Sequence, residues 1–191
     1  MIMGRLLLTG LIAAAASVVH AESVTYAIDP SHTFVTFEAN HFGTSTLRGR
    51  FDRKDGAVMI DKAAKTGKAE ISVDANSVST GVPALDTHLK GKDFLNTAEF
   101  SRVTFSADQF SFSGDKVSEV AGTLTLLGKT QPVTLKATHY NCYLNPLIKR
   151  ETCGGDFETT ITRSRFGMPY GLDYGLPDDI HLLIQIEAVK Q

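Results

Sequence analysis

The sequence predicts an all-β protein, folded as a single antiparallel domain with one short helix. Three observations carry this prediction. Apolar and polar residues alternate along most of the chain, as they do in strands with one buried face. At least eight such stretches are joined by short turns, which is typical of a β-sandwich or a closed antiparallel barrel. Only near residues 83–95 does helical spacing replace the alternation.

The first 21 residues indicate an export signal rather than part of the fold. Arg5 precedes an apolar run from Leu6 to Val19, and the small residue Ala21 fits a signal-peptidase site. The run is shorter than the ~20 residues that span a bilayer, although an uncleaved anchor is the alternative. We therefore expect residues 1–21 to be removed and residues 22–191 to form an exported, periplasmic domain that does not span the membrane.

The expected strands follow one another with short connections. Gly49–Phe51 and Ala57–Ile60 are expected to form a hairpin with its turn at Asp55-Gly56. The remaining strand signals cover residues 26–29, 33–39, 69–73, 102–112, 122–127, 132–140, 155–163 and 179–189.

The helical insert near residues 83–95 has one apolar face. Leu85 and Leu89 stand four residues apart, Pro83 suits a first helical turn, and Gly91 ends the helix before Phe94 and Leu95. A short amphipathic helix in a β-protein usually covers something. We expect it to close one end of the barrel.

The expected interior is rich in phenylalanine, because the chain has eleven phenylalanines and no tryptophan. The last strand places Ile180, Leu182, Ile184, Ile186 and Ala188 on one side. In a barrel of about eight strands such side chains either fill the interior or line a cavity for one ligand, and composition does not decide between the two. The other inward candidates are aromatic: Phe34, Phe37, Phe51, Phe105, Phe110, Phe112 and Phe157.

Charge and cysteine content narrow the functional classes. One of the 19 basic residues, Arg5, lies in the signal segment, which leaves 18 against 21 acidic residues and a net charge of −3. No basic cluster occurs, so a nucleic-acid partner is not expected. Cys142 and Cys153 both follow the expected cleavage point, and an exported pair of this kind is expected to form a structural disulfide.

The residue spacing gives little support for a metal site or a catalytic site. His32, His41, His88, His139 and His181 lack the spacing of a zinc site, and no Gly-x-Ser-x-Gly motif occurs. Asp86 and His88 form the one close acid–imidazole pair, but residues two apart on a helix point in different directions. The arginine pair in the segment 163–167 either binds an anionic head group or a partner surface, or is a solvated corner with local hydrogen bonds.

Several motifs, in order, resemble the YceI-like, polyisoprenoid-binding family. They comprise Tyr26-x-Ile-Asp-Pro-Ser-His32, His41-Phe-Gly43, Leu47-Arg-Gly-Arg-Phe51, Leu85-Asp-Thr-His-Leu89, Gly122-Thr-Leu-Thr-Leu-Leu-Gly-Lys-Thr-Gln-Pro-Val133 and Arg163-Ser-Arg-Phe-Gly167. Where the family pattern often has an arginine before Asp86, this chain has Leu85. The resemblance implies a periplasmic, lipocalin-like barrel that holds an isoprenoid, an isoprenoid quinone or a similar long-chain amphiphile, without a cofactor.

The resemblance also implies where the ligand lies. His32, His41, Asp86 and His88 would form or brace the cavity mouth. A carrier is therefore expected, with a lipid-modifying enzyme that uses His88 and Asp86, or a packed structural or stress-related protein, as alternatives; a homodimer follows from analogy alone. The expected ligand-binding residues are Phe34, Phe37, His41, Phe51, Asp86, His88, Leu89, Phe94, Phe105, Phe112 and Arg163.

Overall fold

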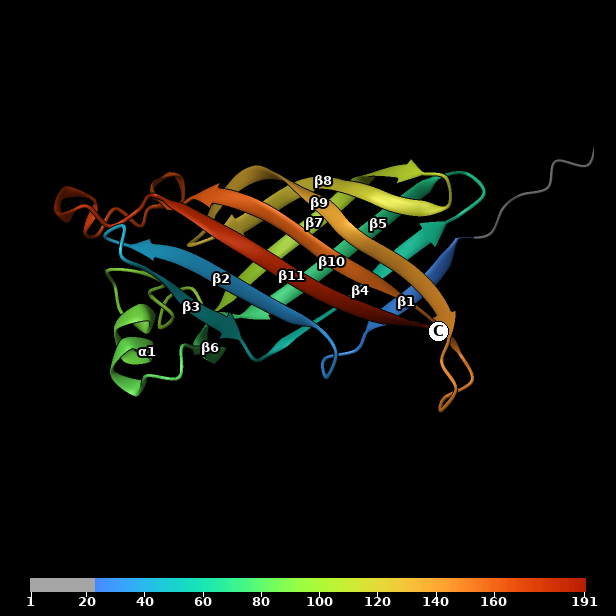
Figure 1. Cartoon of the computed structure of the whole chain (residues 1–191), viewed down its shortest axis with the longest axis horizontal. Helices are drawn as coiled ribbons and strands as arrows, with labels where there is room; N and C mark the ends of the chain where they lie inside the picture. Colours follow the sequence, from blue (N-terminus) through green and yellow to red (C-terminus); the bar gives the residue numbers. More distant parts are fainter. Residues whose placement is uncertain (1–22) are drawn as a thin grey trace, which may run out of the picture.

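The structure, a computed structural model, describes residues 23–191 (Figure 1). The expected signal peptide lies outside these residues. In the described part of the chain, no helix is long and apolar enough to cross a membrane.

Eleven antiparallel strands make up most of this region, which confirms the predicted all-β class. One α-helix, α1 (Pro83–Lys90), and three 3₁₀ turns, η1 (Ala75–Ser77), η2 (Arg163–Phe166) and η3 (Leu172–Tyr174), connect them. The strands are β1 (Val24–Ile28), β2 (Phe34–His41), β3 (Ser45–Phe51), β4 (Lys54–Asp61), β5 (Thr66–Asp74), β6 (Val78–Ser79), β7 (Arg102–Ser113), β8 (Lys116–Leu126), β9 (Lys129–Leu144), β10 (Glu151–Thr162) and β11 (Asp179–Lys190).

Eight strands close into a barrel in the order β1-β4-β5-β7-β8-β9-β10-β11, and β11 returns to β1. The edge of β11 is shared by two strands. Its C-terminal end pairs with β1, where Ala188 faces Ile28, and its N-terminal half pairs with β2, where Leu182 faces Phe37. The β2-β3-β6 ribbon therefore extends the wall at the end of the barrel that carries α1 (Figure 1).

The predicted hairpin between Gly49–Phe51 and Ala57–Ile60 is wrong. β3 pairs with β2 and β6, whereas β4 pairs with β1 and β5. Asp55 and Gly56 lie inside β4, opposite Ser72 and Ile71, and the chain passes from β3 to β4 through Asp52-Arg53. The Asp-Gly pair is a turn signal only when the flanking strands pair with each other, and here barrel closure separates them.

Side-chain alternation sets the two faces of the wall. The five β11 residues predicted to share a face all point into the barrel: Ile180, Leu182, Ile184, Ile186 and Ala188. Gly49 lies opposite Phe37, and a Cβ there would stand 2.3 Å from the end of the Phe37 ring. Glycine at this position lets the ring lie across β3 on the inner face.

Helix α1 is shorter than the expected insert, because it ends at Lys90 and residues 91–100 continue as turns. Pro83 occupies its first turn, and the Gly91 N–H bonds to the His88 carbonyl. The following turns are fixed to the helix by bonds from the Leu95 and Thr97 N–H groups to the Leu89 and Lys90 carbonyls (2.9 and 3.0 Å). The helix and these turns form one continuous cover, called the α1 cover below.

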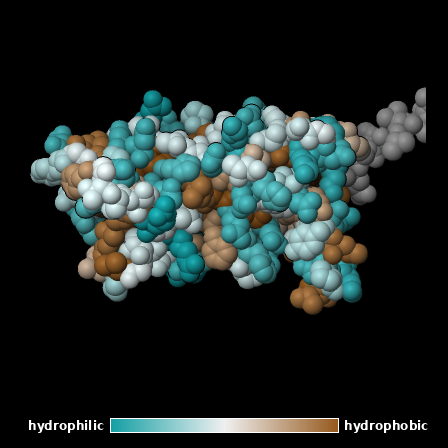
Figure 2. Space-filling view, in the orientation of Figure 1, coloured by the Kyte–Doolittle hydropathy of each residue, from teal (hydrophilic) through white to brown (hydrophobic). Residues whose placement is uncertain are grey.

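The predicted disulfide is confirmed. Cys142 and Cys153 are direct cross-strand neighbours in β9 and β10 and are bonded. They close the base of a hairpin whose tip exposes Leu144, Leu147 and Ile148, visible as a hydrophobic projection on the molecular surface (Figure 2).

Candidate ligand-binding cavity

A cavity of about 470 Å³ runs inside the barrel, and its wall is almost wholly apolar. Its volume is within the range of about 300–1,000 Å³ that small-molecule sites occupy. All eight barrel strands, β2, β3, the α1 cover and the segment 163–178 contribute to the wall.

The barrel is hollow rather than filled. Phe37, Phe51, Phe105 and Ile184 point inward, yet each retains partial solvent exposure because it borders the cavity. Most of the fully buried apolar side chains form two clusters. One, around Tyr26, Val120 and Phe157, lies in the body and disulfide end of the barrel; the other, around Leu95, Phe166 and Met168, lies beside α1.

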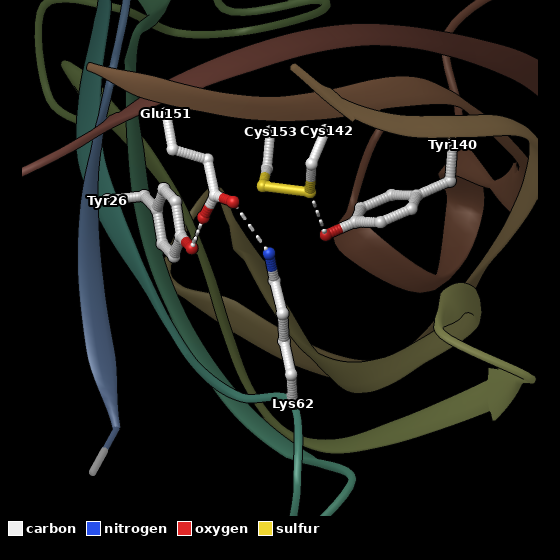
Figure 3. Close-up of a disulfide and its surroundings, with 6 residues drawn as sticks. All are labelled: Tyr26, Lys62, Tyr140, Cys142, Glu151 and Cys153. Atoms are coloured by element: carbon white, nitrogen blue, oxygen red, sulfur yellow. Dashed lines mark hydrogen bonds and ion pairs between the residues drawn. A yellow bond between two sulfur atoms is a disulfide. The ribbon is translucent and has the colours of Figure 1, made fainter. Parts of the chain in front are cut away.

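The buried residues Tyr26, Tyr140 and Cys153 line the disulfide end of the cavity. Figure 3 shows them with Glu151 and Lys62 around the disulfide. Tyr26, with 1% of its surface exposed, donates a hydrogen bond to Glu151, which also pairs with Lys62 at 3.0 Å. The Tyr140 hydroxyl lies 3.6 Å from the Cys142 sulfur. Burial and the nearby Glu151 carboxylate raise the pKa of Tyr140 to about 12, so this hydroxyl stays neutral. These contacts form a sealed floor.

An aromatic cluster stands at the opposite end. The His88 ring meets Phe94 and Tyr170 edge-on, with centroid separations of 5.0 and 5.3 Å, and Phe94 and Tyr170 are 5.3 Å apart. All three residues border the cavity, and His88 and Tyr170 are also exposed to solvent, as is the cavity-lining His41 on β2. This end is the mouth.

Asp86 braces the mouth without bordering the cavity. Its carboxylate accepts hydrogen bonds from the Thr80 N–H (2.7 Å) and hydroxyl (2.6 Å), and these bonds lower the pKa of Asp86. The side chain therefore fixes the chain entering α1. His88 contacts Asp93 (3.3 Å) rather than Asp86, so the two residues form no acid–imidazole pair.

Arg163 is the charged residue of the wall. It is 4% exposed, and it begins η2 at the mouth end. Nε donates to the Pro177 carbonyl (2.7 Å) and Nη1 to the Met168 carbonyl (2.5 Å). Burial lowers its pKa, and the nearby Asp178 carboxylate opposes this effect.

The structure brings together most of the residues that the sequence singles out, and whether they bind ligand stays a prediction. Phe112 packs against the core near the Lys65 ammonium, 5.6 Å from its ring, and like Asp86 it does not border the cavity. The predicted residues on the cavity wall are Phe37, His41, Phe51, His88, Leu89, Phe94, Phe105 and Arg163.

Phe34 is wrong as an inward residue. Val35, Phe37 and Ala39 face the cavity, so strand alternation turns Phe34 outward. Its ring covers the Lys54 ammonium at 4.7 Å, a cation–π contact on the outer wall.

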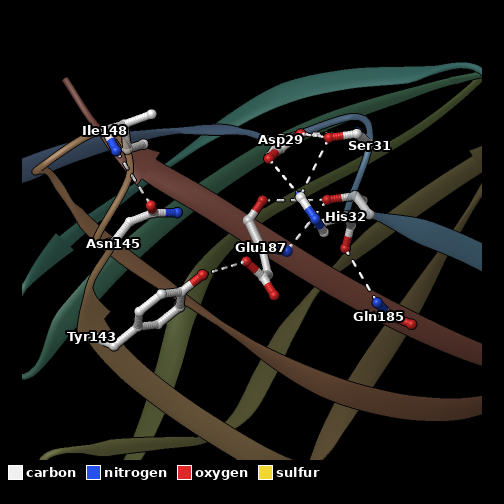
Figure 4. A network of polar contacts seen from close by, with 9 residues as sticks. Asp29, Ser31, His32, Tyr143, Asn145, Ile148, Gln185 and Glu187 are labelled. Carbon is white, nitrogen blue, oxygen red and sulfur yellow. Dashed lines mark hydrogen bonds and ion pairs between the residues drawn. The ribbon is translucent and has the colours of Figure 1, made fainter.

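His32 is also absent from the mouth, because it lies outside the barrel in the β1–β2 turn (Figure 4). Its Nδ1 contacts the Asp29 carboxylate at 2.8 Å, and Ser31 donates to the same carboxylate. These bonds lower the pKa of Asp29 to about 2 and raise that of His32. Ser31 and Asp29 approach the same ring nitrogen, which is not the arrangement of a nucleophile–base–acid triad.

Several wall residues escape sequence reasoning. Met168 comes from the irregular segment between η2 and β11, where no periodicity indicates a face. Tyr26 and Tyr140 lie in strands, and their parity could have placed them inside. Among residues 23–191, no group of three or more His, Cys, Asp or Glu side chains is placed to hold a metal ion.

Solved structures share this architecture. BcnA of Burkholderia cenocepacia superimposes with a TM-score of 0.70 at 22% identity, covering 84% of this chain and 99% of that one. A polyisoprenoid binding domain from Saccharophagus degradans, implicated in plant cell wall breakdown, superimposes with a TM-score of 0.61 at 15% identity, covering 87% and 98%. Because both sequence identities are below 25%, these superpositions show a shared fold alone.

Sequence comparisons identify the family. Protein YceI of Salmonella arizonae is 33% identical over 174 residues, and a UPF0312 protein of Pseudomonas paraeruginosa is 32% identical over 175 residues. Each match covers 90% of both chains. The family model of the YceI-like domain matches residues 26–188. The chain therefore belongs to the YceI-like family.

Proposed function

We propose that this protein is a periplasmic carrier that holds a single-chain isoprenoid, an isoprenoid quinone or a similar amphiphile inside its barrel, without chemical conversion. The observation that carries the proposal is the apolar cavity, which is sealed at the disulfide end and open beside α1. The polyisoprenoid binding domain with the same fold supports the ligand class. The expected signal peptide and the disulfide support an oxidising, exported location.

The energetics favour a lipid tail. Each methylene group moved from water into such a cavity contributes about 0.8 kcal/mol. An apolar wall therefore binds long chains with few polar contacts. Because one methylene group more or less changes affinity only modestly, we expect selectivity for a class of lipids rather than for one molecule.

Organic extraction of the purified protein, followed by mass spectrometry, tests the proposal. We expect a long-chain lipid in stoichiometric amounts. Recovery of no lipid from several expression hosts, together with failure to bind added prenyl lipids, would contradict the carrier function. Turnover of a bound prenyl lipid would favour the enzyme instead.

Neighbouring positions on β11 provide a matched pair of variants. Ile184 faces the cavity, whereas Leu183 faces outward and is 36% exposed. We expect Ile184→Trp to fill the cavity and abolish lipid recovery, and Leu183→Trp to retain lipid at the wild-type level. Equal lipid content in the two variants would place the ligand elsewhere.

A further inference from the structure

The turn that joins β9 to β10, residues 144–150, presents a group of apolar side chains to solvent and is called the hairpin tip below (Figure 2). Leu144, Leu147 and Ile148 are 67%, 89% and 44% exposed. None of the three borders the cavity or belongs to the two core clusters. Single exposed apolar residues are ordinary on a protein surface, whereas a group of them on one projecting turn is typical of a contact site.

The hairpin tip is also basic. Lys149 and Arg150 are exposed, and neither forms an ion pair among residues 23–191. The adjoining Glu151 carboxylate is occupied by Tyr26 and Lys62. The mature chain is net negative, so these free cations are a local exception. Aliphatic side chains beside free cations complement a bilayer surface, in which anionic head groups lie above an apolar layer.

The backbone of the hairpin tip suits insertion into that layer. The Asn145 side chain accepts hydrogen bonds from the N–H groups of Leu147 (2.9 Å) and Ile148 (3.3 Å; Figure 4). The Asn145 carbonyl accepts one from the Lys149 N–H (2.9 Å), and Pro146 has no N–H to satisfy. A protein groove can supply partners to free N–H groups but an acyl layer cannot, so a turn that satisfies its own donors favours lipid as the occupant.

We propose that the hairpin tip docks the protein on an anionic phospholipid surface. Leu144, Leu147 and Ile148 reach the acyl boundary, and Lys149 and Arg150 lie among the head groups. The hairpin projects from the end of the barrel opposite α1, so the docked protein turns its mouth away from that surface (Figure 1). This docking goes beyond the proposed carrier function and does not depend on what the cavity holds.

Tryptophan fluorescence shows which end of the protein meets the lipid, because the chain contains no tryptophan of its own. The full mature chain carrying Leu147→Trp is mixed with vesicles of phosphatidylcholine and phosphatidylglycerol in equal parts. We expect a blue shift of its emission. Tyr174→Trp is the matched control, since Tyr174 is 74% exposed in η3 at the mouth end, and its emission should not move. No shift in either variant, or an equal shift in both, overturns the proposal.

Co-sedimentation with vesicles measures the contribution of charge. Wild-type protein should bind the mixed vesicles at least tenfold more tightly than vesicles of phosphatidylcholine alone. Lys149→Gln/Arg150→Gln should weaken binding to the mixed vesicles roughly 30-fold, about fivefold for each basic residue. Lys92→Gln/Arg165→Gln removes the same charge from exposed positions outside the hairpin tip and should bind as wild type. Equal losses in the two double variants overturn the proposal.

The apolar contribution is measured in the same way. Leu147→Ser/Ile148→Ser should weaken binding to the mixed vesicles at least tenfold, because two aliphatic side chains no longer leave water. Ile184→Trp, with its cavity filled, should still bind the vesicles as wild type does. Loss of vesicle binding in Ile184→Trp would mean that the vesicles only supply lipid to the cavity, which overturns docking. Wild-type protein that binds neither kind of vesicle also overturns the proposal, and a protein partner then becomes the occupant of the hairpin tip.

Discussion

Tyr26 and Glu151 show how single residues seal the cavity. Tyr26 is buried at the floor, and its hydroxyl donates a hydrogen bond to the Glu151 carboxylate. That bond is the largest cause of the lowered pKa of Glu151, and the Lys62 ammonium acts in the same direction (Figure 3). Because these buried polar groups have hydrogen-bond partners, they close the end of the barrel at little cost in folding free energy.

We expect Tyr26→Phe to lower the free energy of unfolding by about 1–2 kcal/mol, because a buried charge-assisted hydrogen bond is lost. Urea denaturation at neutral pH measures this difference. Tyr143→Phe is the matched control, since Tyr143 is 41% exposed and its hydroxyl bonds to Glu187 on the outer surface (Figure 4). A control loss as large as that of Tyr26→Phe would contradict the role of burial.

The Tyr26→Phe penalty should depend on pH. The pKa of Glu151 is lower in the folded protein than its ordinary value of 4.5, so the carboxylate contributes stability above pH 4.5 and loses it as pH falls through the folded pKa. The difference between wild type and variant is therefore expected to shrink below pH 4.5. A constant difference in urea titrations from pH 7 to pH 3 would exclude this ionic contribution.

At the scale of elements, the α1 cover and the β9–β10 hairpin lie at opposite ends of the barrel. Helical spacing in the sequence predicts the cover, and Leu85, Leu89, Phe94 and Leu95 face the interior as expected. Which strands pair is less predictable. The same Asp-Gly signal fits a turn or a strand interior, and only closure of the whole sheet decides between them.

The mouth cluster is expected to slow ligand exchange. Tyr170→Ala removes two aromatic contacts, to His88 and Phe94, each worth about 0.5–1.5 kcal/mol. If both are lost on opening, release of a bound fluorescent prenyl analogue should accelerate by roughly 5–160-fold. Stopped-flow displacement measures the rate. Tyr174→Ala is the control, because Tyr174 is 74% exposed and does not border the cavity. Equal acceleration in both variants would mean that the cluster does not form the gate.

The hairpin disulfide is expected to stabilise the floor. By the loop-entropy model, closing a loop with a sequence separation of 11 contributes about 3 kcal/mol. Replacing both cysteines with serine should lower the free energy of unfolding by about this amount. Reducing agent should destabilise wild type similarly and leave the double variant unchanged; an equal response of both proteins would exclude the disulfide as the cause.

At the scale of the whole molecule, alternating apolar residues predict a barrel but not its contents. The β11 face from Ile180 to Ala188 would appear the same above a packed core and above a cavity. Hollowness depends on how far the strands stand apart and on which rings cross the interior. Tyr170 reaches the mouth from an irregular segment, where no alternation of apolar and polar residues indicates which way a side chain points. Those properties arise only when the sheet closes.

A hollow barrel should gain stability from its ligand. At a free ligand concentration about 100 times the dissociation constant, binding contributes about 2.7 kcal/mol, which corresponds to a rise in Tm of roughly 5–10 °C for a domain of this size. Differential scanning calorimetry with farnesyl monophosphate measures the shift. Ile184→Trp, with its cavity filled, should show no shift; a similar rise in that variant would indicate binding outside the barrel.

Under the carrier function proposed above, the closed floor would set the order in which a bound lipid moves. A tube with one opening empties in the reverse order of filling, so the tip of the lipid tail would enter first and leave last. An acceptor at the mouth meets the head first and engages it while the tail is still sheltered from water. The lipid would then pass directly from the cavity to the acceptor. Its tail would be drawn out progressively instead of being released whole into solution.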